Sequence, residues 1–245
     1  MKKARLLRFA IGILCCIFVF GCVYFRTDPF HMIGGAFCHQ FETRTPFAGG
    51  RSYPFCYRCT GLFFGIFVSL LYFRLSELHM SPFSHFALVF TACAAVFFVI
   101  DILNATTLWE IELYPDQTVT RMLSGYSMGF ALVLIIQPMR DLLLDEEPEE
   151  AGTISGKNAL PMFVFGGVFL TFLVYKTGFA GYFLVGSLTI FSAVYFLYCL
   201  YEMFFTILLQ ENIREWSILL TLLHLTAAGI LHLIIIEKTV QMILQ

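Results

Sequence analysis

Hydrophobic residues along this chain of 245 residues occur in long continuous runs, separated by short polar stretches. A helix needs about 20 apolar residues to cross the hydrocarbon core of a bilayer, and fewer where its polar ends reach the interface. Seven runs meet this requirement. The predicted spans are residues 6–25, 59–73, 83–103, 122–139, 159–175, 181–205 and 217–236. The pattern therefore predicts an all-α fold, a polytopic transmembrane helical bundle of about seven spans.

Composition supports the membrane class. Hydrophobic residues make up 59% of the chain and charged residues only 13%, with a mean hydropathy of +0.81, whereas about a quarter of the residues in soluble domains are charged. Membrane lipids are therefore the expected surroundings. The net charge is −2, and no basic cluster follows the first residues, so we expect no nucleic-acid partner.

The basic residues at the start of the chain predict the orientation. They are Lys2, Lys3, Arg5 and Arg8, and a positive flank of this kind stays in the cytoplasm. Alternation then places residues 26–58, here named the motif loop, and residues 104–121 on the extracytoplasmic side of the cell membrane. The first run also fits a cleaved signal, with Cys22 in a loose lipoprotein box, although the bulky Phe20 fits poorly there. Either origin leaves the motif loop outside.

An acidic, turn-rich stretch divides the chain. Residues 145–150 read Asp-Glu-Glu-Pro-Glu-Glu and are followed by glycines, a composition typical of a linker. We predict a four-span unit at residues 1–140 that carries the motif loop, a cytoplasmic linker at 141–158 and a three-span unit at 159–245. No internal repeat relates the two units, which counts against an inverted-repeat transporter.

Three of the eight cysteines stand apart from the rest. Five lie inside apolar runs and read as small buried hydrophobes: Cys15, Cys16, Cys22, Cys93 and Cys199. Cys38, Cys56 and Cys59 share the motif loop with His39 in the spacing Cys-His-x16-Cys-x2-Cys, which approaches the spacing of zinc sites. Neighbouring residues rarely both bind one ion, so three cysteines with an open fourth position are as plausible as Cys3His. The metal ligands predicted here, with zinc as the expected ion, are Cys38, His39, Cys56 and Cys59.

The same sulfurs allow two other interpretations. A Cys-x-x-Cys pair at a helix N-terminus, with Arg58 between the two residues, favours the reactive thiolate, as in a membrane thiol-disulfide oxidoreductase. The layout is similar to that of the bacterial disulfide-generating membrane oxidoreductases. Alternatively, Cys38 pairs with Cys56 or Cys59 in a structural disulfide, which would stabilise a loop of this length by about 3 kcal/mol.

Several ionisable residues lie in or beside the apolar runs. Asp101 near the outer end of the third span and Arg121 at the start of the fourth could, with Arg58, act in catalysis or contact a substrate. The alternative role is an ion pair of Asp101 with Arg121 or Arg58. We expect Glu202 to reach the cytoplasmic interface by snorkelling. His224 and His232 could line an ion path, although hydrogen bonds to neighbouring helices are the more usual role of such histidines.

The motif loop resembles a prokaryotic membrane family, the one called domain of unknown function 2085. The resemblance covers about residues 37–134 and is carried by the motifs Cys38-His39-Gln40, Arg51-Ser52, Cys56-Tyr57-Arg58-Cys59-Thr60-Gly61, Asp101 and Arg121-x-x-x-Gly125. Ile102 stands where the family usually has glycine, and the three C-terminal spans lie outside the resemblance. The family implies a membrane protein but no reaction.

Three functions follow from these observations. The first is a membrane protein with a Cys/His site for a metal, expected to be zinc, at the extracytoplasmic boundary. This site could be catalytic if the metal keeps an open position. The second is a thiol-disulfide oxidoreductase that uses Cys56 and Cys59. The third is a transporter or lipid-handling protein in which a disulfide only shapes the outer loop. No hydrolase nucleophile elbow, phosphate-binding glycine loop or His-Glu-x-x-His motif occurs.

Overall fold

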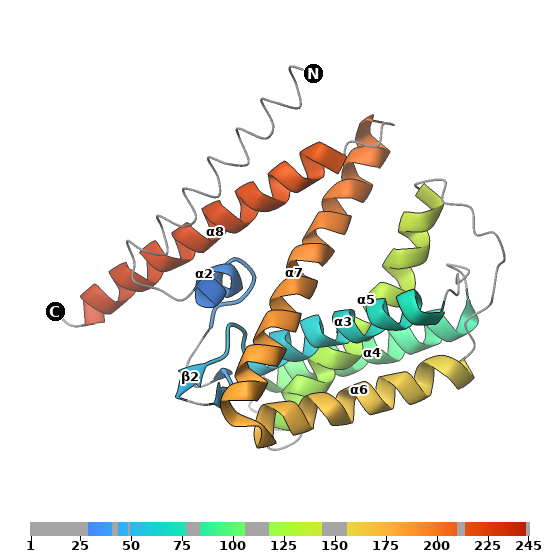
Figure 1. Cartoon of the computed structure of the whole chain (residues 1–245), viewed down its shortest axis with the longest axis horizontal. Helices are drawn as coiled ribbons and strands as arrows, with labels where there is room; N and C mark the ends of the chain where they lie inside the picture. Colours follow the sequence, from blue (N-terminus) through green and yellow to red (C-terminus); the bar gives the residue numbers. More distant parts are fainter. Residues whose placement is uncertain are drawn as a thin grey trace.

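A computed structural model of the protein describes residues 29–40, 44–48, 50–76, 84–105, 118–143, 156–209 and 214–243. These residues form seven helices and one short antiparallel hairpin (Figure 1). In chain order the elements are α2 (Pro29–Gly35), β1 (Phe47–Ala48), β2 (Arg51–Ser52), α3 (Tyr57–Ser76), α4 (His85–Ala105), α5 (Thr118–Leu143), α6 (Gly156–Lys176), α7 (Gly178–Leu209) and α8 (Arg214–Ile243).

The predicted all-α membrane fold is confirmed. The helices α3 to α7 are each long and apolar enough to cross a membrane, while the apolar part of α8, Trp216–Leu231, is shorter. The six predicted spans from residue 59 onward coincide with α3 to α8. The first predicted span, Cys22 and most of the predicted linker lie outside the described residues.

The helices α3 and α5 form the closest pair in the bundle. Gly61 and, one turn later, Gly65 face the carbonyl oxygens of Met122 and Tyr126, and a Cβ on either glycine would overlap that backbone. The later glycine of α3 contacts the later residue of α5, so α3 and α5 run in the same direction. Small residues that let two backbones approach in this way are typical of helix pairs in membranes.

Polar contacts gather at the two ends of the bundle. The starts of α3 and α5 meet the end of α6, since Tyr57 stacks on Tyr175 with ring centroids 6.4 Å apart and Thr118 shares a 2.7 Å hydrogen bond with the Tyr175 hydroxyl. Near the last turn of α5, Arg140 binds Glu202 of α7. Spans that follow one another in the chain, such as α5, α6 and α7, therefore alternate in direction. The end with Tyr57 is here named the cysteine end, because α3 begins there directly after Cys56.

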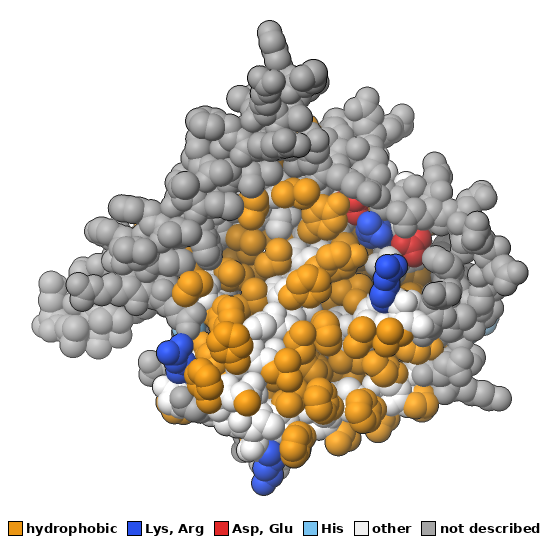
Figure 2. Space-filling model, in the orientation of Figure 1, with side chains coloured by type: hydrophobic (Ala, Val, Ile, Leu, Met, Phe, Trp, Pro, Cys, Tyr) orange, Lys and Arg blue, Asp and Glu red, His pale blue; other side chains and the backbone are white. Residues whose placement is uncertain are grey.

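The outer surface of the helices is apolar, as lipid contact requires. Figure 2 shows hydrophobic side chains over the face on which α6 and α7 lie, with a few Lys and Arg side chains at its margins. Phe165 in α6 and Phe191 in α7 are 66% and 60% exposed. Exposed apolar surface on this scale marks contact with a membrane or a partner, and the length of the helices identifies the membrane.

The described part of the motif loop is folded against the C-terminal helices, which the sequence did not indicate. Met32 of α2 is fully buried and lies against Gly229 of α8, while the Tyr53 ring meets Tyr182 of α7 at 5.5 Å. Figure 1 shows α2 between α7 and α8, with β2 below it. This packing gives Cys38 a fixed position.

Candidate metal centre

Cys56 and Cys59 are positioned by the first turn of α3. The carbonyl of Cys56 accepts the first helical hydrogen bond from the amide of Thr60 at 2.8 Å, so Cys56 is the N-cap residue. The Thr60 hydroxyl donates to the carbonyl of Phe55 at 3.0 Å, which ties the turn to the preceding loop. Residues three apart on a helix lie on one face, so the two sulfurs point to the same side.

Cys38 is positioned by the chain that leaves α2. Its amide donates to the carbonyl of Gly34 at 2.9 Å. Two residues later Gln40 adopts a positive φ of 49°, and its Nε2 donates to the carbonyls of His31 and Pro54, both at 2.8 Å. Gln40 thus joins the segment after α2 to the segment before α3, and it holds Cys38 beside Cys56.

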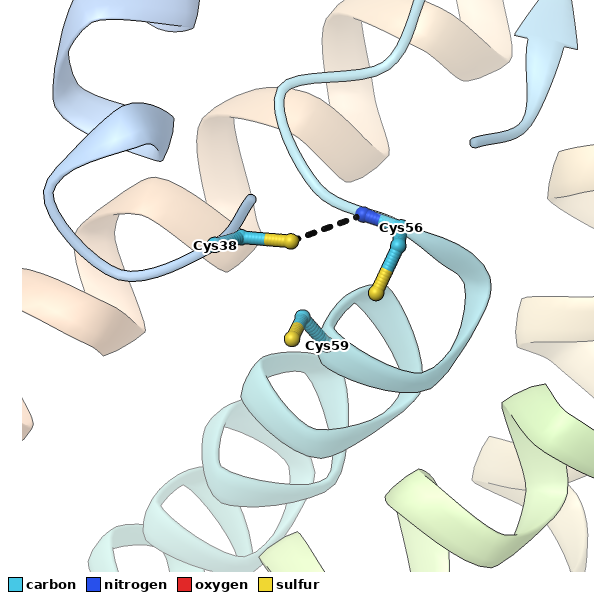
Figure 3. A group of neighbouring side chains, drawn as sticks. All are labelled: Cys38, Cys56 and Cys59. Carbon is cyan, nitrogen blue, oxygen red and sulfur yellow. Dashed lines mark hydrogen bonds between the residues drawn. The ribbon is translucent and has the colours of Figure 1, made fainter. Parts of the chain in front are cut away.

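The three cysteines meet at one point, here named the cysteine cluster. All three sulfur atoms lie within 4.8 Å of one another, and the amide of Cys56 donates to the sulfur of Cys38 at 3.4 Å (Figure 3). Cys38 and Cys56 are buried and Cys59 is half-buried. All three are free thiols. Apolar side chains, including Phe55 and Phe63, pack around the cluster.

The thiols of the cluster differ in pKa. Hydrogen bonds from the side chains of Cys38 and then Cys59 hold the pKa of Cys56 well below its usual range, against the opposing effect of burial. The hydrogen bond with Cys56 is also the main cause that raises the pKa of Cys38, to which burial adds. Before any metal binds, Cys56 is therefore the preferred thiolate, and thiolate is the form that metals require.

His39 lies apart from the three sulfurs. Its ring is exposed, and it is not among the residues whose ligand atoms lie within 4.8 Å of one another. Among the described residues the group that could hold a metal consists of Cys38, Cys56 and Cys59. A ligand role for His39 stays a prediction.

Arg58 and Asp101 form the ion pair that the sequence offered as an alternative to catalysis. Arg58 Nε donates to Asp101 Oδ2 at 2.6 Å, and its Nη2 donates to the backbone carbonyl of Asp101 at 3.1 Å. Ser124 of α5, a residue that sequence reasoning missed, donates to the same Asp101 oxygen at 3.0 Å. Arg121 is buried in the first turn of α5, where its carbonyl accepts from Ser124 at 2.9 Å. Asp101 is therefore connected to the cysteine cluster through Arg58.

A second buried ion pair lies away from the cysteine end, and it corrects one expectation. Glu202 is 1% exposed, accepts from Arg140 Nε at 2.8 Å and from the Tyr198 hydroxyl at 2.8 Å. The expected snorkelling of Glu202 is wrong, because Arg140 of α5 reaches it inside the bundle. The hydrogen-bonding role of His224 is confirmed by its 3.1 Å bond to Tyr201 of α7. The His232 side chain is outside the described residues.

Comparison with known proteins is informative for one segment of the chain. No curated protein and no solved structure matches the chain. A protein-family model does match, from Cys38 into α5. This segment includes the cysteine cluster, Arg58, Asp101 and Arg121 and leaves α6 to α8 outside, as the motifs predicted. Residues 38–135 therefore match the family described as "Predicted membrane protein (DUF2085)", and the resemblance inferred from the motifs is confirmed.

Proposed function

We propose that this multi-pass membrane protein binds a zinc ion through the thiolates of Cys38, Cys56 and Cys59. The supporting observation is that the three sulfurs, from segments 18 residues apart in the chain, lie within 4.8 Å of one another. A tetrahedral zinc with Zn–S bonds of about 2.3 Å needs sulfurs about 3.8 Å apart. Side-chain shifts of about 1 Å would therefore close the site around an ion.

The surroundings of the cluster favour a thiolate metal site. The N-terminus of α3 places partial positive charge beside the sulfurs of Cys56 and Cys59. Apolar neighbours such as Phe55 and Phe63 limit water around an ion. Three thiolates suit a soft or borderline metal, and zinc among these metals requires tetrahedral geometry without a redox reaction.

A site with three protein ligands leaves a fourth position. Structural zinc sites are closed by four protein ligands, whereas catalytic sites keep one position for water or substrate. The exposed ring of His39 could fill this position, and so could an external ligand. Where the position stays open, the zinc could activate bound water or polarise a substrate, and Asp101 and Arg121 would be the candidate groups for such a reaction.

We place the cluster at the extracytoplasmic side of the membrane. The basic residues Lys2, Lys3, Arg5 and Arg8 favour a cytoplasmic N-terminus, and one crossing would then bring the motif loop outside. Arg74 and Arg140, in the last turns of α3 and α5, would lie at the cytoplasmic side. An oxidising compartment makes metal occupancy important, because bare thiols so close together would pair there.

Metal analysis with matched cysteine variants tests the proposal. Protein purified in detergent without chelator should contain about one equivalent of zinc, and Cys38→Ser, Cys56→Ser and Cys59→Ser should each lose most of it. Cys199→Ser, which removes a buried cysteine of α7 outside the cluster, is the control and should retain the metal. Less than about half an equivalent in the parent protein, with Cys38 in a disulfide to Cys56 or Cys59, would refute the proposal.

One observation favours thiol-disulfide exchange as a second candidate. Three free thiols lie within 4.8 Å of one another, two of them at the N-terminus of α3, and this arrangement is typical of exchange-active cysteines. A quinone would then accept the two electrons and two protons released when two of the thiols form a disulfide. Rapid reduction of an added quinone by metal-free protein, lost in Cys56→Ser, would support this candidate. No reaction would exclude it.

A further inference from the structure

A single buried carboxylate connects three helices beside the cysteine cluster. The Asp101 side chain is 1% exposed, lies in the last turns of α4, and accepts hydrogen bonds from Arg58 of α3 and Ser124 of α5. Burying a charge is costly unless it is paired and hydrogen-bonded. The two donors meet this requirement, so the carboxylate is held in one place.

Arg58 connects the fixed carboxylate of Asp101 to the turn that carries the metal ligands. It lies between Cys56 and Cys59 in the first turn of α3, and both its backbone and its side chain are held. A Cβ on Gly125 of α5 would overlap the Arg58 carbonyl, so the two backbones are in close contact. The guanidinium is held by the carboxylate and by the backbone carbonyl of Asp101. The turn that presents the two sulfurs therefore has little freedom to rotate about the helix axis.

The charges in this arrangement give Asp101 two opposing effects. A zinc ion with three thiolates carries a net negative charge, which Arg58 favours. The Asp101 carboxylate offsets part of that positive charge, so charge alone would make its removal strengthen metal binding. Loss of the fixed turn would weaken binding instead. The sign of the effect therefore distinguishes an electrostatic role from a positioning role.

We propose that Asp101 is a positioning residue for the cysteine cluster, which acts through Arg58 to fix the first turn of α3 in the geometry that binds metal. The inference rests on the proposed zinc site. Groups that orient metal ligands without touching the metal typically change metal affinity 10–100-fold when they are replaced, and Asp101→Asn should weaken zinc binding by about this factor.

The chain offers a matched control at the opposite end of the bundle. Glu202 is also 1% exposed, binds an arginine at 2.8 Å and accepts a second hydrogen bond from a hydroxyl group. Glu202→Gln therefore removes a comparable buried charge far along the helices from the cluster. A loss of zinc affinity through general destabilisation would appear in both variants, whereas a positioning effect would appear only in Asp101→Asn.

Two measurements on the full chain complete the test. Zinc affinity is measured by chelator competition, and Co²⁺ substitution reports the geometry of the thiolate site through its absorption bands. We expect Asp101→Asn to bind zinc about 10–100-fold more weakly with shifted Co²⁺ bands, and Glu202→Gln to change neither. Equal affinities in the two variants, or tighter binding by Asp101→Asn, would refute the inference.

A third measurement needs no metal. In chelator-treated protein, a mild oxidant should form the disulfide between Cys38 and either Cys56 or Cys59 more slowly in Asp101→Asn than in Glu202→Gln, because the first turn no longer holds its sulfurs toward Cys38. If the parent protein binds no metal, the proposed function fails while this rate still tests the positioning role. Equal rates would refute that role.

Discussion

The backbone carbonyl of Arg58 in α3 occupies the space that a Cβ on Gly125 of α5 would need. The same turn of α3 carries Cys56 and Cys59, so the packing of two membrane helices and the geometry of the cysteine cluster depend on one contact. Helix packing at small residues is therefore directly linked to the candidate metal site in this protein.

Gly125→Ala should destabilise the protein by about 1–3 kcal/mol, because the added methyl group forces α3 and α5 apart. Thermal unfolding in detergent measures the change. Gly167→Ala in α6 is the control, since the nearest neighbour of its added methyl group would be a side-chain atom of Tyr126 at 3.3 Å and not a backbone atom. An equal loss of stability in the two variants would show that the close contact of α3 with α5 is not the cause.

Two substitutions at Gln40 separate the effect of its hydrogen bonds from the effect of its strained backbone. Gln40→Ala removes the hydrogen bonds to His31 and Pro54 and keeps a side chain at a positive φ, so we expect a loss of about 1–3 kcal/mol. Gln40→Gly removes the same bonds but relieves the backbone strain, so its loss should be smaller by up to about 1 kcal/mol. Chemical unfolding measures the free energy of unfolding of both variants. A larger loss with glycine would contradict the strained conformation.

The sequence predicted the helices and the cysteine cluster for simple physical reasons. A span must be apolar along its whole length, so its position can be read from hydropathy alone. Cys38, Cys56 and Cys59 lie in one polar stretch, and two of them are three residues apart at a helix start. Most folds of such a stretch bring its thiols together. The predicted ion pair of Asp101 also formed, because an unpaired charge at that depth would be costly.

Contacts between distant segments were not predictable in this way. The packing of Met32 on α8 and of Tyr53 on α7 depends on how the motif loop returns to the bundle, and no local pattern records that path. Glu202 looked like a residue near an interface because its partner Arg140 is 62 residues away in the chain. Gln40 was visible as part of a motif, but its two backbone acceptors were not.

Removing Arg140 should be more harmful than removing the whole Arg140–Glu202 pair. Arg140→Gln leaves the carboxylate of Glu202, 1% exposed, without its cation, and breaking a buried pair in this way costs about 3–5 kcal/mol. The double variant Arg140→Gln with Glu202→Gln removes both charges and should recover most of that loss. Unfolding in detergent gives the free energies. A double variant less stable than Arg140→Gln would contradict a simple charge pair.

The last prediction concerns the side of the membrane on which each end of the bundle lies. Phe47 in the hairpin is 68% exposed at the cysteine end, and Leu142 near the end of α5 is 69% exposed at the other. A cysteine introduced at either position should be equally accessible to a thiol reagent once the membrane is dissolved.

In intact cells or right-side-out vesicles, an impermeant maleimide should label Phe47→Cys and not Leu142→Cys, because we place the cysteine cluster outside. The parent chain, treated identically, gives the background from its native cysteines. Labelling of Leu142→Cys alone would reverse the orientation, and it would place the thiols in the reducing cytoplasm, where a disulfide between them is disfavoured and a metal is the stronger interpretation of the cluster.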